Sequence, residues 1–157
     1  MKFCFSFLVS IFLFVSCGDP CDDVNCDNGG SCDDGTCICL TGYTGDNCQT
    51  EIRSSYYGTW DVVYSCDNDP VDVQQGEAII TADPDDILGI CILLDEVPVK
   101  ASIDDNGLLT VPSQMIEDYL DEGEFSGNGV LLSETGTINL IVNSDGETYA
   151  CMFSLSR

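Results

Sequence analysis

Cysteine and the carboxylic acids are the residue types of this chain that could do chemistry. Its 157 residues include eleven cysteines, 28 Asp and Glu, four Lys and Arg, and no histidine. Without histidine, Ser–His and Cys–His nucleophilic systems and histidine-containing zinc sites are excluded. A carboxylate pair is the remaining catalytic option, but so many acids form pairs by chance that none can be singled out. We therefore expect no enzymatic activity, no catalytic residues and no metal-ligating residues.

The cysteines indicate an oxidising compartment, because so many thiols in a short chain would be a liability among cytosolic reductants. Cys4 lies in an apolar leader and Cys17 at its end. Six more are crowded between residues 21 and 48, which leaves Cys66, Cys91 and Cys151 for the rest of the chain. This distribution predicts a leader, a small cross-linked module and a larger domain with few cross-links.

Residues 1–16 have the form of a secretory signal peptide. Lys2 precedes an apolar run that ends at Val15 and is too short to span a membrane. The sequence from Phe14 to Cys17 then resembles the lipobox of bacterial lipoproteins. That resemblance implies that Cys17 is lipidated and that residues 17–20 anchor and tether the protein, each buried methylene contributing about 0.8 kcal/mol. The alternative is ordinary signal cleavage near Ser16 or Cys17, which would release a secreted protein.

The cysteine-dense segment, residues 21–49, has the spacing Cys-x4-Cys-x5-Cys-x4-Cys-x-Cys-x8-Cys, with Asn-Gly-Gly before the third cysteine and Gly-Tyr-Thr-Gly before the last. This pattern resembles an EGF-like domain. The resemblance implies the disulfides Cys21–Cys32, Cys26–Cys37 and Cys39–Cys48. So short a segment buries too little apolar surface to fold unaided, so cross-links must hold it. We expect a rigid spacer, with protein recognition as the alternative.

Calcium binding is a second alternative for this module. Asp34 fits one element of the calcium-binding EGF-like pattern, but no aromatic residue lies between Cys32 and Cys37. Only residues 18–20 separate Cys17 from Cys21, which leaves little room for the usual acidic segment. Acidic runs farther along the chain do not fit EF-hand spacing and are interpreted as turns or solvated faces. No cofactor is therefore predicted, with calcium kept as the alternative.

Residues 53–157 are expected to form a domain of about eight short strands, because alternating apolar segments are separated by turn residues. Asn106-Gly107 and Asp145-Gly146 predict type I′ hairpin turns. Residues 113–122 are ambiguous, because their apolar residues also have helical spacing. The predicted strands are 58–66, 76–82, 87–94, 97–104, 107–112, 124–132, 136–143 and 147–156.

Short connections favour an all-β, antiparallel up-and-down meander that closes into a barrel and so removes its exposed edges. The first and last strands provide the test of closure. If Cys66 pairs with Cys151 across antiparallel neighbours, all the apolar partners fall on one face, as a buried face requires. The partners across this ladder are Tyr64 with Phe153, Val62 with Leu155, and Trp60 with Arg157.

Gly58-Thr59-Trp60 resembles the Gly-x-Trp motif of the first strand in lipocalin-like, or calycin, barrels. The resemblance implies a late arginine, here Arg157, packed over Trp60. The domain is shorter than a typical lipocalin, so we expect large inward residues to fill the barrel rather than line a roomy cavity. Cys91 lies in an apolar segment and is expected to be a free, buried thiol; a bridge to Cys17 is conceivable only if Cys17 carries no lipid.

The formal charge of −24, or −25 once Lys2 is removed with the leader, argues against nucleic acid or an anionic membrane as a direct partner of the folded part. The whole chain resembles surface lipoproteins of Gram-negative bacteria, which implies an outer-membrane anchor on Cys17 and a periplasmic or surface-exposed position. We expect an extracytoplasmic binding or interaction protein whose EGF-like spacer presents the barrel to a protein or a small apolar ligand. The alternative is a purely structural envelope lipoprotein with a filled barrel. The sequence indicates no oligomeric state.

Overall fold

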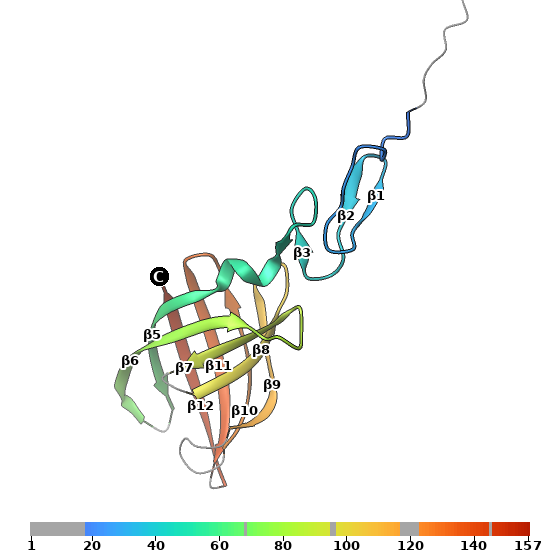
Figure 1. Ribbon diagram of the computed structural model, residues 1–157. Coiled ribbons are helices and arrows are strands. Elements are labelled where there is room, and N and C mark those ends of the chain that lie inside the picture. The colour runs from blue at the N-terminus through green and yellow to red at the C-terminus, as the bar shows by residue number, and fades with distance from the viewer. Residues whose placement is uncertain (1–17, 68, 95–96, 117–122, 145) are drawn as a thin grey trace, which may run out of the picture.

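The computed structural model describes residues 18–67, 69–94, 97–116, 123–144 and 146–157. The predicted signal peptide and the predicted lipidation at Cys17 lie outside the described residues. A small cysteine-dense module and a larger barrel lie end to end, joined by the short 3-10 helix η1 (Ile52–Tyr56) (Figure 1). Among the described residues, no helix has the length and apolar character needed to cross a membrane.

The cysteine-dense module contains two small hairpins. β1 (Ser31–Asp33) pairs with β2 (Thr36–Ile38), and β3 (Tyr43–Thr44) pairs with β4 (Thr50–Glu51). Asp34 and Gly35 join β1 to β2, and both have positive φ, 46° and 81°. A two-residue loop with this geometry is a type I′ turn, which the Asp-Gly dipeptide favours.

The barrel has eight antiparallel strands in the closed order β10-β11-β12-β5-β6-β7-β8-β9. Each strand neighbours the next one in the chain, and β12 pairs with β5 to close the ring. The prediction of an all-β fold with an eight-stranded up-and-down barrel is confirmed. The strands are β5 (Gly58–Cys66), β6 (Asp69–Ala82), β7 (Gly89–Leu94), β8 (Val97–Ile103), β9 (Leu108–Ile116), β10 (Gly123–Leu131), β11 (Thr135–Ser144) and β12 (Glu147–Ser156).

The closing ladder has the register that the alternation predicts. Cys151 lies opposite Cys66, Phe153 opposite Tyr64, and Leu155 opposite Val62. Because side chains alternate across a strand, all of these residues share the inner face.

One ambiguous segment is resolved in part, and one turn prediction is wrong. Residues 113–116 of the ambiguous segment continue strand β9 rather than starting a helix: Met115 is exposed and Ile116 is buried, which is strand alternation. Residues 117–122 of that segment lie outside the described part of the chain.

The turn at Asn106-Gly107 is not type I′, because only Gly107 has positive φ (77°). The Asp104 side chain accepts hydrogen bonds from the backbone N–H groups of Asn106 and Leu108, which favours a longer loop ending in a left-handed glycine. At the other predicted hairpin Gly146 has φ of 80°, and Asp145 lies outside the described residues.

The core fills the inside of the barrel with aliphatic side chains around Trp60, because alternate residues of each strand face inward. Its buried members are Tyr56, Trp60, Val62, Ala78, Ile80, Ile90, Ile92, Leu94, Val99, Ala101, Ile103, Leu109, Val111, Ile116, Leu131, Ile138, Leu140 and Leu155.

Candidate functional site

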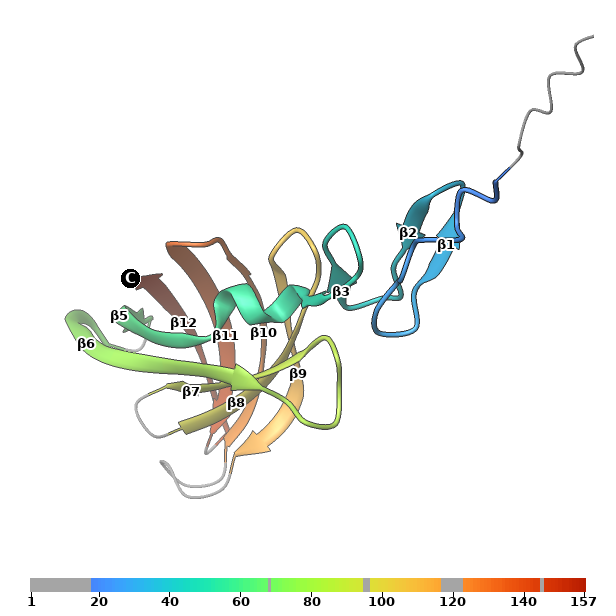
Figure 2. The same cartoon turned by 45° about the horizontal axis from the view of Figure 1, so that its top comes forward.

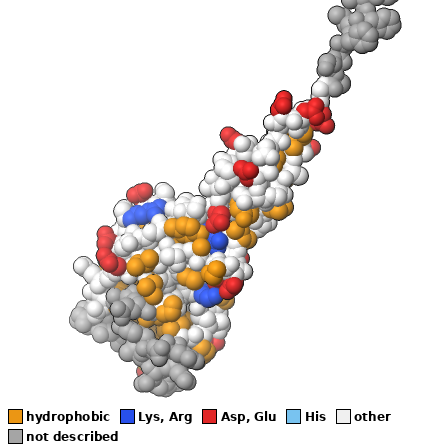
Figure 3. Space-filling view, viewed as in Figure 1, with side chains coloured by type: hydrophobic (Ala, Val, Ile, Leu, Met, Phe, Trp, Pro, Cys, Tyr) orange, Lys and Arg blue, Asp and Glu red, His pale blue; other side chains and the backbone are white. Residues whose placement is uncertain are grey.

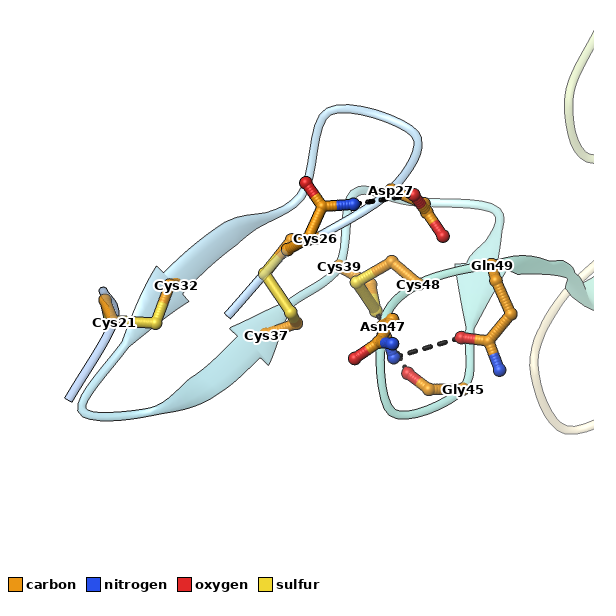
Figure 4. The surroundings of a disulfide bond; sticks show 11 residues. Cys21, Cys26, Asp27, Cys32, Cys37, Cys39, Gly45, Asn47, Cys48 and Gln49 are labelled. Atoms are coloured by element: carbon orange, nitrogen blue, oxygen red, sulfur yellow. Dashed lines mark hydrogen bonds between the residues drawn. A yellow bond between two sulfur atoms is a disulfide. The ribbon is translucent and has the colours of Figure 1, made fainter. Parts of the chain in front are cut away.

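Four disulfides hold the two modules. Figure 4 shows the three bridges of the N-terminal module, Cys21–Cys32, Cys26–Cys37 and Cys39–Cys48. These are the pairings that the EGF-like resemblance implies. The fourth bridge, Cys66–Cys151, joins the first and last strands of the barrel.

Asp34, the candidate calcium ligand of this module, occupies the first position of the type I′ turn between β1 and β2. A left-handed backbone at a non-glycine residue is best tolerated by Asn and Asp. The residue type at position 34 is therefore accounted for by the turn. Asn28, also left-handed, donates its side-chain amide to the Cys48 carbonyl at 2.8 Å.

Trp60 and Arg157 close the end of the barrel that faces the N-terminal module. Trp60 is fully buried and donates its indole N–H to the Tyr56 carbonyl at 3.0 Å. The Arg157 guanidinium lies 4.3 Å from the Trp60 ring centroid and also donates to the backbone carbonyls of Ser55, Tyr57 and Ser133. The arginine that the lipocalin-like resemblance implies thus holds η1 and the C-terminal strand over the same ring.

Arg53, in η1, is the main polar contact between the linker and the barrel. Its side chain is buried, and Nη1 donates to the Asp83 and Gly89 carbonyls, each at 2.7 Å, and to the Asp86 carbonyl. Nε forms an ion pair with Glu51 at 3.0 Å. A buried guanidinium with several acceptors fixes the orientation of η1 on the barrel, because each lost hydrogen bond would leave a buried polar group unsatisfied.

The N-terminal module also touches the barrel directly. A Cβ placed on Gly42 would lie 2.7 Å from Ile87 Cγ1, and Gly42 has φ of 92°. The Tyr57 hydroxyl donates to Glu51 at 3.2 Å, and burial raises the Tyr57 pKa, with Glu51 adding to the rise. Apolar contact and a hydrogen-bond network together make this junction a packed interface rather than a free linker.

Two cations of the protein, Arg53 and Lys100, bind the acidic loop at residues 83–88. Arg53 donates hydrogen bonds to the backbone carbonyls of Asp83 and of Gly89, which directly follows the loop. Lys100 forms a 3.0 Å ion pair with Asp83. The Asp85 backbone N–H and Lys100 lower the pKa of Asp83, and the bond to Asp83 raises the pKa of Lys100. The loop therefore docks η1. Among the described residues, no cluster of three potential metal ligands occurs.

The opposite end of the barrel carries partly buried aromatic residues. Tyr64 and Phe153 stack with ring centroids 5.1 Å apart, and Phe125 and Val97 also pack against the core while remaining partly exposed. The connections between β5 and β6, β7 and β8, β9 and β10, and β11 and β12 all leave from this end. We call it the loop-bearing end. It lies away from the N-terminal module (Figure 2).

Cys91 is a free thiol, but it is not buried as the sequence analysis expects. It lies on the outer face of β7 and is partly exposed, whereas Ile90 and Ile92 beside it are buried. Strand alternation places it opposite Thr81 and Lys100 rather than inside. A uniformly apolar segment gave no indication of which residues point inward.

The comparisons with known proteins concern a quarter of the chain. A stretch of 43 residues is 49% identical to fibropellin-3 of Strongylocentrotus purpuratus, covering 25% of this chain and 8% of fibropellin-3. No family model matches the chain. Together with the three disulfides, the match supports an EGF-like module followed by a small β-barrel.

Arg53 and Gly42 are the residues of the module junction that sequence reasoning missed. One signal was present: Arg53 is one of only four basic residues in a strongly acidic chain and stands between the two modules. Gly42 was recognised only as part of the EGF-like pattern, and its contact with Ile87 depends on how the two modules pack.

Proposed function

We propose that this protein is an extracytoplasmic binding protein, anchored through acyl chains on Cys17, whose EGF-like module holds the barrel with its loop-bearing end away from the membrane. The arrangement of the two modules carries the proposal. Residues 18–20 begin at the end of the module farthest from the barrel (Figure 1). Buried Arg53 packs the junction between the two modules. Because the junction is packed, the length of the EGF-like module separates the barrel from the membrane.

The proposed ligand is a small apolar molecule at the loop-bearing end. Partly exposed aromatic side chains are suited to such contacts because they supply a large apolar area with little loss of conformational freedom. Tyr64, Phe125 and Phe153 provide this surface, while the aliphatic core fills the rest of the barrel. The resemblance of residues 14–17 to a lipobox and of the whole chain to Gram-negative surface lipoproteins supports a location in the cell envelope, at the outer membrane.

A neutral naphthylamine probe tests the binding role. We expect saturable binding with energy transfer from Trp60, the single tryptophan. Phe153→Ala should weaken binding about tenfold by removing the ring that stacks on Tyr64. Met152→Ala is the matched control, because this neighbour is 51% exposed on the outer face.

Equal effects of the two substitutions, or no saturable binding by the wild-type protein, would contradict a ligand site at this end. Absence of saturable binding would favour the alternative, a structural envelope lipoprotein whose filled barrel binds no ligand.

A further inference from the structure

Strand β6 has an unpaired edge on the side of the barrel. It runs from Asp69 to Ala82 and pairs with β5 over most of that length, but it pairs with β7 only from Ala78 to Ala82. Among the described residues, no strand lies on the other side of residues 69–77. Pro70 has no N–H to donate, so the usable edge covers residues 71–77, which we call the β6 edge.

An open strand edge exposes alternate N–H and C=O groups that another extended segment can pair with. The described outer side chains along the edge are Val73, Gln75 and Glu77, all exposed. Val73 is 64% exposed, more than any other large apolar side chain among the described residues. Its exposure gives the edge an apolar contact beside its backbone groups.

Two acids lie directly opposite each other beside this edge. Asp61 on β5 pairs with Glu77 on β6, both are exposed, and neither has an ion-pair partner among the described residues. Like charges in directly opposed positions destabilise a sheet. A cation placed beside them would relieve that repulsion.

The three cations among the described residues all have other partners. Arg53 is bound to Glu51 and to carbonyls of the loop at 83–88, Lys100 to Asp83, and Arg157 to Trp60 and backbone carbonyls. Figure 3 shows acidic side chains at several places on the viewed surface and few basic ones. With a net charge of −24, a second copy of the chain is a poor occupant, because pairing two β6 strands would bring acids together.

We propose that the β6 edge docks an extended basic segment of a partner protein, which adds to the barrel as a strand. Backbone hydrogen bonds to residues 71–77 provide the pairing, a Lys or Arg side chain lies beside Asp61 and Glu77, and an apolar side chain contacts Val73. The edge starts near the loop-bearing end, where Gln74 pairs with Tyr64, but its outer side chains point away from the inward-facing aromatic residues of the proposed ligand site.

A peptide of alternating Lys and Val, as long as the β6 edge, is the test probe for the full chain. Binding should slow amide hydrogen exchange within residues 71–77 and should weaken with salt. The double variant Asp61→Asn/Glu77→Gln should bind the peptide about tenfold more weakly. It should also melt at a higher temperature than wild type, because the like-charge pair is gone.

Three comparisons make the test specific. Asp22→Asn/Asp23→Asn removes the same charge from the N-terminal module, away from the β6 edge, and should leave affinity within about twofold. A peptide with N-methylated valines should not bind, because it cannot pair as a strand. Equal binding of the methylated peptide, equal losses in the two double variants, or a dimer formed through residues 71–77 would each overturn the proposal.

Discussion

Arg53 links three segments of the chain through one buried side chain. Its contacts with Glu51 and with the carbonyls of Asp83 and Gly89 connect the linker to the loop between β6 and β7. We expect Arg53→Ala to lower the free energy of barrel unfolding by about 2–4 kcal/mol, since buried carbonyls would lose a charged donor. Denaturant unfolding followed by Trp60 fluorescence measures this.

Arg53→Lys is the matched control for that substitution. Lysine keeps the charge but cannot reproduce the planar guanidinium, so its loss should be intermediate. Unchanged stability in Arg53→Ala would show that the junction does not depend on this residue.

Asp104 gives the loop between β8 and β9 a pH dependence. The backbone N–H of Leu108, with help from Asn106, lowers the pKa of Asp104 below its ordinary value of 3.8. A lowered folded-state pKa stabilises the protein above that ordinary value, and the contribution disappears as pH falls through the folded-state pKa. Asp104→Ala should therefore lower the melting temperature at pH 7.

The difference between Asp104→Ala and wild type should shrink as pH falls below about 4, which thermal melts across pH can follow. Asp105→Ala is the control, because Asp105 accepts only from the exposed Asn106 side chain. A difference that is constant with pH would contradict the role assigned to the Asp104 carboxylate.

Individual residues were predictable where local patterns fixed their partners. Trp60 and Arg157 follow from a short motif and the register of two strands, and they do meet. Arg53 was not predictable in this way, because its acceptors lie on a loop about thirty residues away and depend on packing. Cys91 was misplaced because an unbroken apolar run does not show which face is inside.

At the scale of elements, the first and last strands hold the barrel closed. The Cys66–Cys151 bridge spans a sequence separation of 85 residues. In the chain-entropy account, removing a cross-link over so long a loop costs about 4 kcal/mol. We expect the double variant Cys66→Ala/Cys151→Ala to lose about that much in calorimetry or denaturant unfolding.

Cys91→Ala serves as the control for this double variant, because it removes a thiol without removing a bridge. A similar loss from both changes would contradict a cross-linking role for the Cys66–Cys151 pair.

Strand alternation predicted the elements well where turns were marked by short polar runs, as for β5 and β12, whose observed bounds equal the predicted ones. It failed where side chains replaced regular pairing. β8 and β9 share only two residue pairs, and the Gln114 side chain bonds both the N–H and the carbonyl of Lys100 in place of a backbone partner. A side chain that replaces a backbone hydrogen-bond partner leaves no periodic pattern in the sequence. The helical spacing of residues 113–116 was therefore misleading.

At the scale of the molecule, the two modules form an extended unit with residues 18–20 at one end and the loop-bearing end of the barrel at the other (Figures 1 and 2). Module order and fold class were predictable from cysteine spacing and strand alternation. The packed junction was not predictable, because the local sequences around Gly42 and Ile87 contain no pattern that predicts their contact. In the proposed function this arrangement holds the loop-bearing end away from the membrane, which requires that the chain be acylated at Cys17.

Acylation at Cys17 is tested directly by intact mass. The protein is purified from its native membrane and measured after thiol alkylation without reductant. We predict an acylated chain that begins at Cys17 and takes up one label, at the partly exposed Cys91, without unfolding. All the other cysteines after Cys17 are paired in the four bridges. A mass without acyl chains would contradict the anchored account, and if that chain also took up no label, the result would indicate a released protein with Cys17 in a further bridge to Cys91.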